Sequence, residues 1–368
     1  MRVGAVHRRT IWDEEGEVRI LDQTRIPDAL EVVTLDSAED AAEAIRTMQV
    51  RGAPLIGATA AYGLALAARR DPSGTALEEA RRLLLATRPT AINLRWALDR
   101  CLKALLERPE DERPAASLEL ARALCEEDVG TNRRIAEHAW RILKARAEAV
   151  GAGPDTGRPL QVLTHCNAGW LATVDVGTAT AGIYRAHDAG FPLHVWVDET
   201  RPRGQGARLT AWELAQHGVP HTVIPDVAAG HLMATGRVDL VLVGTDRTTA
   251  QGDVVNKIGT YGVALAARDA GVPFWVAAPG PSLDFRLRDG REVPIEQRSP
   301  EEVTWVGGAR EKGGHARVRV VSEGSPAANF AFDVTPARLV TGIITERGPT
   351  EATEDALARL YPERVGAP

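Results

Sequence analysis

A cysteine stands at the end of a short apolar strand pattern, where the sequence turns to small and polar residues. Residues 161–163 read Gln-Val-Leu, and residues 164–169 (Thr-His-Cys-Asn-Ala-Gly) follow, ahead of a stretch rich in Ala, Thr and Gly that is typical of a helix. Open α/β sheets bind ligands at the carboxyl ends of their strands, and a following helix N-terminus would favour a thiolate. Cys166 is therefore a candidate catalytic residue. The alternative is a small buried core residue, which most free cysteines are.

A carboxylate ends a second apolar strand pattern downstream. Residues 241–243 (Val-Leu-Val) lead to Asp246, and residues 252–257 (Gly-Asp-Val-Val-Asn-Lys) are interpreted as a polar loop that opens a helix. A carboxyl group walled by apolar residues has a raised pKa and can act as a general acid near neutral pH. The alternatives are a helix cap or a partner for Arg247, and capping is the stronger interpretation for Asp253. Together, the thiol and the carboxyl group indicate proton-transfer chemistry on a small anionic substrate.

Three turns combine arginine with glycine or proline and could bind an anionic group. Residues 51–57 (Arg-Gly-Ala-Pro-Leu-Ile-Gly) precede a helix, whose first N–H groups bind anions, and Arg51 adds a forked donor. Residues 87–93 place Arg88 at another helix start, and residues 201–210 supply further arginines. Each turn alone is a weak signal, because surface arginines are usually solvated. The glycines around Gln205 are not a dinucleotide fingerprint, because a leucine stands where the third glycine belongs.

Composition excludes several classes of protein. The 368 residues suffice for two domains, and a net charge of −6 gives no sign of nucleic-acid binding. Three cysteines make no disulfide framework, the first residues lack the apolar core of a signal peptide, and no apolar run approaches the ~20 residues of a membrane span. We therefore expect a cytoplasmic protein. Cys101 and Cys125 lie inside helical patterns and are assigned to the core, and the scattered histidines predict no metal site.

The hydrophobic pattern changes rhythm near the middle of the chain. Short strands are predicted up to about residue 23, and helices over 38–48, 58–68, 77–87, 94–106 and 115–147. A Gly/Pro-rich linker at 150–159 follows. Strands over 160–163, 193–197, 221–224, 238–243 and 274–277 then alternate with helices over 178–189, 209–217, 228–234 and 258–270. Residues 284–324 form an irregular excursion with hairpin character, and residues 332–345 are strand-like again.

This alternation predicts an α/β fold. We expect a mainly helical N-terminal domain with short strands over residues 1–149. A Rossmann-like catalytic domain, with a parallel sheet covered by helices on both faces, should occupy residues 150–368.

Segments along the whole chain form one recognisable pattern: residues 21–24, 51–54, 87–90, 164–169, 198–202, 205–210, 252–260, 294–296 and 332–336. In these segments, and over nearly its whole length, the chain resembles the methylthioribose-1-phosphate isomerases. This superfamily also holds regulatory subunits of the translation-initiation exchange factor and ribose-1,5-bisphosphate isomerases. Loop positions such as Gln251 and Phe330 depart from the family pattern, and residues 307–324 look longer and more basic than usual.

The resemblance implies an aldose–ketose isomerase of methionine salvage that converts 5-methylthioribose 1-phosphate to 5-methylthioribulose 1-phosphate. It implies a homodimer and no metal or cofactor. Cys166 would stand beside the reacting carbons, and Asp246 would be the general acid. The substrate contacts would be Arg51, Gly52, Ala53, Arg88, Gln205, Asn256 and Lys257. Two alternatives stay open: an isomerase of 5-deoxyribose 1-phosphate or ribose 1,5-bisphosphate, and a regulatory protein that binds a sugar phosphate or nucleotide without turnover.

Overall fold

A seven-stranded sheet organises the C-terminal half of the computed structural model, which describes residues 1–88, 91–312 and 314–366. Its strand order is β18-β17-β12-β9-β6-β7-β8. All neighbouring strands are parallel except β18, which pairs antiparallel with β17. The predicted parallel sheet is thus confirmed. The strands are β6 (Leu160–Thr164), β7 (Leu193–Asp198), β8 (His221–Ile224), β9 (Leu240–Val243), β12 (Phe274–Ala277), β17 (Gly342–Thr345) and β18 (Gly348–Thr350).

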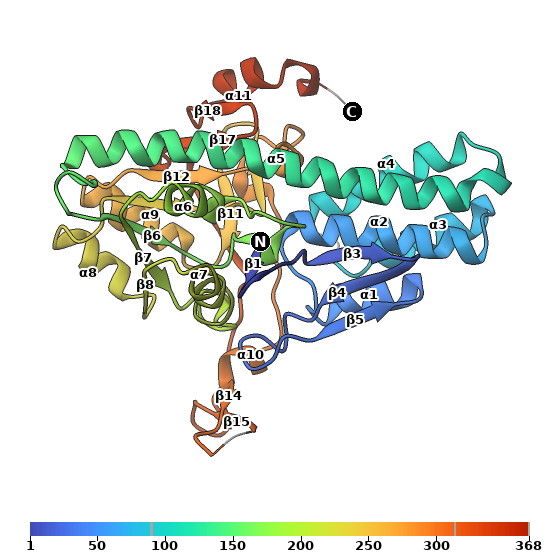
Figure 1. Ribbon diagram of the computed structural model, residues 1–368, viewed down its shortest axis with the longest axis horizontal. Coiled ribbons are helices and arrows are strands. Elements are labelled where there is room, and N and C mark those ends of the chain that lie inside the picture. Colours follow the sequence, from blue (N-terminus) through green and yellow to red (C-terminus); the bar gives the residue numbers. More distant parts are fainter. Residues whose placement is uncertain (89–90, 313, 367–368) are drawn as a thin grey trace.

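Helices cover both faces of this sheet, as predicted (Figure 1). Side chains alternate between the faces along a strand. Leu240 and Leu242 therefore pack into the core shared with α6 (Ala179–Asp188) and α7 (Ala211–His217). Val241 and Val243 pack into the opposite core, formed with α8 (Ala228–Ala234), α9 (Thr260–Asp269) and α11 (Glu354–Leu360).

The N-terminal half is mainly helical and carries a three-stranded antiparallel sheet. Its helices are α1 (Ala38–Arg46), α2 (Ala53–Arg70), α3 (Gly74–Leu85), α4 (Ile92–Leu106) and α5 (Arg113–Val150). Its strands are β3 (Ile11–Glu14), β4 (Glu17–Leu21) and β5 (Val32–Leu35), with a small hairpin of β1 (Arg2–Val3) and β2 (Val6–His7) before them. Strand β5 lies beyond the predicted strand region. Residues 89 and 90, inside one predicted arginine turn, lie outside the described residues.

Helix α2 begins five residues before the predicted start. Pro54 stands in its first turn, where proline fits because the backbone N–H groups there have no helical partner. Its small residues allow close packing: a Cβ at Gly63 would lie 2.9 Å from the Cβ of Ala41. This close packing holds α2 against α1 within the N-terminal half.

Helix α5 runs along both halves of the molecule (Figure 1). Residues from Ala116 to Val129 pack into the N-terminal core, and residues from Ile135 to Ala147 pack into the core of the large sheet. The helix ends at Gly151, which adopts a left-handed conformation with φ of 67°. Helix α5 thus joins the two cores as one continuous element. The division of the chain into domains between residues 149 and 150 stays a prediction.

A second sheet is built from segments that occur in the chain between β9 and β17, and its strand order is β13-β10-β11-β16. Its strands are β10 (Arg247–Thr249), β11 (Val254–Lys257), β13 (Leu283–Asp284) and β16 (Phe332–Thr335). The predicted loop over 252–257 is wrong, because β11 occupies most of it and α9 begins at Thr260. Asp253 is likewise no helix cap, since its carboxylate accepts hydrogen bonds from the N–H groups of Gly290 and Ala337, both at 2.9 Å.

The predicted excursion contains a hairpin that projects from the body of the molecule (Figure 1). Its strands, β14 (Trp305–Ala309) and β15 (His315–Arg319), follow the short helix α10 (Glu301–Thr304). No helix in the described part of the chain is both long and apolar enough to cross a membrane. Single helical turns lie at Glu110–Glu112, Trp170–Ala172, Gly206–Thr210, Gly280–Ser282, Gly290–Glu292, Ala337–Leu339 and Pro362–Arg364.

Candidate active site

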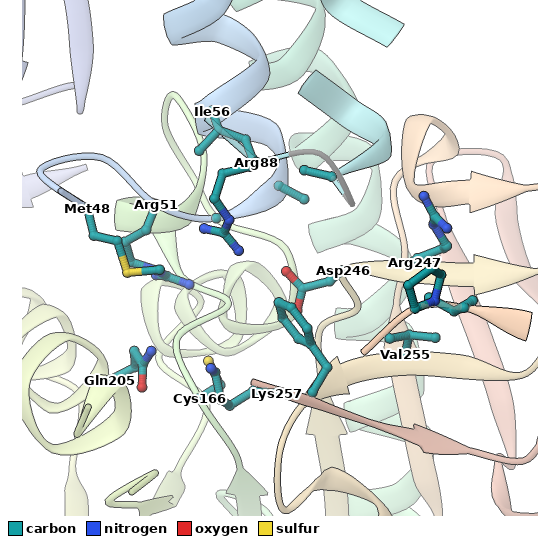
Figure 2. Close-up of a pocket in the computed structure, with 16 residues that line it drawn as sticks. Met48, Arg51, Ile56, Arg88, Cys166, Gln205, Asp246, Arg247, Val255 and Lys257 are labelled. Atoms are coloured by element: carbon teal, nitrogen blue, oxygen red, sulfur yellow. The ribbon is translucent and has the colours of Figure 1, made fainter. Parts of the chain in front are cut away.

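A cavity opens where the ends of β6 and β9 meet the N-terminus of α2 (Figure 2). It holds about 740 Å³ of space that protein atoms do not fill, part of it open to solvent. All the site residues predicted from the sequence line this cavity except Asn256, which lies in an adjoining space that Cys166 and Asp246 also border. The lining is Met48, Arg51, Gly52, Ala53, Ile56, Arg88, Ala91, Cys166, Gln205, Asp246, Arg247, Val255, Lys257, Val293, Pro294 and Phe332.

Two threonines hold the backbone of Cys166 in an uncommon conformation. Its φ is 66°, in the left-handed region that residues other than glycine rarely adopt. The Cys166 N–H donates to Oγ1 of Thr200 at 2.8 Å, and Thr210 donates to the Cys166 carbonyl at 2.7 Å. Strand β6 and these two contacts together fix where the thiol lies.

The expected helix N-terminus behind Cys166 is absent from the described structure. Residues 170–172 form a single 3₁₀ turn, and α6 begins only at Ala179. Burial instead raises the pKa of the Cys166 thiol, an effect that the nearby Arg51 and Lys257 oppose. The predicted helix-stabilised thiolate is therefore wrong, and the sulfur is held as a thiol.

Asp246 borders the same cavity from the end of β9. Burial raises the pKa of its carboxyl group, and the negative charge of Glu296 acts in the same direction. The positive charges of Lys257, Arg88 and Arg51 oppose the shift. The surroundings are thus partly cationic, whereas the sequence suggested a wholly apolar wall.

The helix-cap alternative for Asp246 does not fit the structure. Asp246 directly precedes strand β10 rather than a helix. Its backbone N–H donates to the Val255 carbonyl at 3.0 Å. The Arg247 guanidinium lies 3.7 Å from Asp284.

Three cations surround the thiol and the carboxyl group. Arg51 donates to the side chain and, at 2.8 Å, to the carbonyl of Asn167. Lys257 is buried with its Nζ 5.2 Å from the ring centre of Phe332, and burial lowers its pKa. Arg88 donates to Glu296 at 3.2 Å. The predicted arginines of residues 201, 203 and 208 do not line this cavity and contact Val303, Glu302 and Ile26 instead.

The backbone at the start of α2 lies close to the Cys166 loop. Gly52 has φ of 97°, and a Cβ there would lie 2.4 Å from the carbonyl oxygen of Ala172. Only glycine fits this approach, which brings the first N–H groups of α2 to the cavity. The arrangement provides donors for an anion beside Arg51.

Two polar side chains remain, Gln205 in the lining and Asn256 in the adjoining space. The buried Oε1 of Gln205 has no hydrogen-bond partner among the described residues. Asn256 donates to Thr260 at 3.0 Å. An unpartnered buried acceptor is costly, so Gln205 is available to a ligand hydroxyl.

A buried histidine behind the thiol escaped the sequence-based prediction. His165 Nδ1 lies 2.9 Å from Asp198 Oδ2, and Nε2 lies 2.9 Å from the Ile258 carbonyl oxygen. The Ile258 carbonyl is an acceptor, so Nε2 carries a proton, and the interactions with Asp198 and Ile258 outweigh burial and raise the pKa of His165. Asp226 lies close enough to complete a metal-binding set, but its oxygens accept the N–H groups of Thr200 and Arg201.

Apolar residues form the remaining walls and were also missed. Met48 and Ile56 come from the N-terminal half, and Val255, Val293 and Phe332 from the C-terminal half. Their types carry no signal in a sequence, because apolar residues are usually core. The cavity therefore combines a charged centre with apolar surface contributed by both halves.

Comparison with known proteins places the chain in a family. Residues 49–352 match the model of the initiation factor 2 subunit family. The chain is 57% identical to the methylthioribose-1-phosphate isomerase of Rhodospirillum rubrum, covering 100% of this chain and 95% of the relative. It is 60% identical to that of Methylorubrum populi, covering 99% of both.

Two solved structures share the fold over almost the whole chain. The 5-methylthioribose 1-phosphate isomerase of Pyrococcus horikoshii matches with a TM-score of 0.83 and 39% identity, covering 98% of this chain and 97% of that one. The translation initiation factor eIF-2B subunit delta of A. fulgidus matches with 0.80 and 37%, covering 97% and 100%. The chain therefore belongs to the initiation factor 2 subunit family and, within it, to the methylthioribose-1-phosphate isomerases.

Proposed function

We propose that this protein converts 5-methylthioribose 1-phosphate to 5-methylthioribulose 1-phosphate, an aldose–ketose isomerisation in methionine salvage. The observation that carries the proposal is a buried thiol and a carboxyl group of raised pKa in one cavity with three cations. The relatives named methylthioribose-1-phosphate isomerase support the same substrate.

Ring opening is the first chemical step. A phosphate on the anomeric oxygen prevents opening by deprotonation of a free hydroxyl, so the ring oxygen must receive a proton. Asp246 in its protonated form supplies that proton as the bond between C1 and the ring oxygen breaks. Burial of the carboxyl group keeps it protonated until the substrate is bound.

Hydrogen must then move from C2 to C1 while the C2 hydroxyl returns a proton to the Asp246 carboxylate and becomes the ketone, and two routes lie open to Cys166. It removes the C2 proton as a base through an enediol-like intermediate, or it steadies charge while a hydride shifts directly. The raised pKa of the thiol favours the second route, because a base would first have to lose its proton. Substrate deuterated at C2 separates them: a hydride shift retains the label at C1, and an enediol loses label to water.

Arg51, Arg88 and Lys257, with the backbone N–H groups of Gly52 and Ala53, are proposed to hold the phosphate. Forked guanidinium groups and a helix N-terminus suit a dianion. Gln205 and Asn256 would bind sugar hydroxyls. Holding the sugar at these points orients C1 and C2 toward Cys166.

The apolar walls are proposed to accept the substituent at C5. Met48 and Ile56 offer contact for a thiomethyl group, whereas a second phosphate would need further cations. This surface favours methylthioribose 1-phosphate over ribose 1,5-bisphosphate. 5-Deoxyribose 1-phosphate, in which C5 is itself a methyl group, would also fit, less tightly.

A turnover assay on purified protein with the three sugar phosphates tests the proposal. We expect the highest kcat/KM with 5-methylthioribose 1-phosphate. A preference for the bisphosphate would overturn the assignment to methionine salvage. Binding of all three without turnover would favour the regulatory alternative. The homodimer stays a prediction for light scattering to test, and the cytoplasmic location stays one for cell fractionation.

A further inference from the structure

A row of alternating charges leads away from the cavity. Arg88 donates to Oε2 of Glu296 at 3.2 Å, and Arg298 donates to the other oxygen, Oε1, at 3.0 Å. Arg298 also donates to Glu302 at 2.9 Å, and Arg203 donates to the same carboxylate at 2.8 Å. The row ties the N-terminal half to the excursion and to the loop after β7.

Glu296 has a special position in this row, because each of its oxygens accepts from a different arginine. Its side chain is 22% exposed and that of Arg88 13%, so solvent screens the pair only in part. Arg88 is also a lining residue of the cavity, where its guanidinium points toward Asp246 (Figure 2). One arginine thus lies between the carboxylate of Glu296 and the proposed general acid.

The charges that face Asp246 come from every element around it. Most of these groups are cations, and Glu296 is the carboxylate among them. The set comprises Lys257 on β11, Arg51 before α2, Arg88 before α4, Cys166 after β6 and Glu296 in the excursion.

We propose that Glu296 is a positioning residue of the isomerase that occupies Arg88 until the substrate phosphate replaces it. Because Arg88 also lines the cavity beside Asp246, the negative charge of Glu296 stands one arginine away from that acid and opposes its ionisation. This inference rests on the proposed function. A phosphate dianion and a carboxylate both seek the same N–H donors, so the two compete for Arg88. A negative charge near a carboxyl group disfavours loss of its proton.

Removing the negative charge of Glu296 should strengthen substrate binding through Arg88 and, at the same time, narrow the pH range in which Asp246 stays protonated. In Glu296→Gln, Arg88 loses a competing anion, so KM should fall roughly two- to fivefold, the range of a partly exposed ion pair. At the same time Asp246 should ionise more readily. The alkaline limb of the kcat profile, where the acid loses its proton, should move to lower pH by roughly 0.5–1 unit. A merely structural contact would not improve binding while narrowing the pH range.

Two further variants separate the effects. Glu296→Asp keeps the charge on a shorter side chain, so its alkaline limb should stay near that of the wild type while the contact to Arg88 weakens. Glu302→Gln is the matched control, because it removes a carboxylate on the same Arg298 at the far end of the row. Its alkaline limb should not move. Thermal melting of each variant identifies any that fail to fold.

The experiment measures KM and kcat against pH for these proteins and, by calorimetry, their binding of inorganic phosphate. A lower KM, tighter phosphate binding and an acid-shifted limb in Glu296→Gln support the proposal. An unchanged or higher KM, or an unmoved limb, overturns it. If the wild type turns over none of the sugars, the proposed function fails. The phosphate titration and an NMR titration of the Asp246 carboxyl group then decide the inference alone.

Discussion

Replacing Asp246 by asparagine should lower activity and raise stability together. Asparagine keeps the shape of the side chain but cannot give the ring oxygen a proton, so kcat should fall at least ~10²-fold, the usual scale of general acid catalysis. The buried carboxyl group also destabilises the fold when it ionises, because its pKa is raised above the ordinary value of 3.8. Asparagine removes that cost.

The stability difference should depend on pH in a defined direction. Below pH 3.8 the carboxyl group is protonated in both the folded and the unfolded chain, so the variant gains nothing. As pH rises above 3.8 the unfolded chain releases the proton first, and the wild type loses stability until the pH passes the folded pKa. Each unit between the two pKa values corresponds to about 1.4 kcal/mol in favour of Asp246→Asn.

Denaturant unfolding of both proteins between pH 4 and pH 8 measures this difference, alongside kcat on the same samples. Wild type and variant share all other titrating groups, so their difference isolates Asp246. A kcat within tenfold of the wild type would refute the role as general acid. A stability gain equal at pH 4 and pH 8 would show that the carboxyl group carries no raised pKa, and a change in KM alone would make it a binding residue.

The remaining predictions concern the thiol, the arginines and the substituent at C5. Cys166→Ser should lose orders of magnitude in kcat with near-normal melting, whereas Cys101→Ser and Cys125→Ser should change only stability; full turnover by Cys166→Ala would contradict this. Arg88→Ala and Arg51→Ala should each weaken substrate binding by ~1.5–3 kcal/mol, the strength of a charged hydrogen bond, and unchanged affinity in both would move the phosphate elsewhere. Exchanging the thiomethyl group for hydrogen should lower kcat/KM only ~10–200-fold, since apolar pockets discriminate modestly, whereas a 5-phosphate should be rejected far more strongly; equal rates on all three sugars would argue against an apolar C5 pocket.

Local pattern in the sequence was enough for most of the fold. Apolar runs of four to six residues bounded by turns predicted β6, β7, β8, β9 and β12, and the 3.6-residue periodicity predicted the N-terminal helices. Polar residues placed directly after two of these strands predicted that Cys166 and Asp246 would meet at one edge of the sheet. This worked because neighbouring parallel strands bring their carboxyl ends to the same edge.

The same reasoning failed where a strand carries polar residues into a buried site. Val254 and Val255 are followed by Asn256 and Lys257, which looked like a loop but form β11. All four residues are buried, because pairing with β10 and β16 satisfies the backbone while the cavity accepts the polar side chains. Strand pairing of this kind depends on partners distant in the sequence, so a local pattern does not contain it.

The sequence by itself determined which groups this protein has for its chemistry and on which strand ends they stand. Only the tertiary structure decided their protonation and their partners. It replaced the expected helix N-terminus behind Cys166 with burial, and it set Arg88 against Glu296, 208 residues away in the chain. The physical reason is that a pKa depends on solvent access and on charges a few ångströms away, and both are created when distant segments pack together.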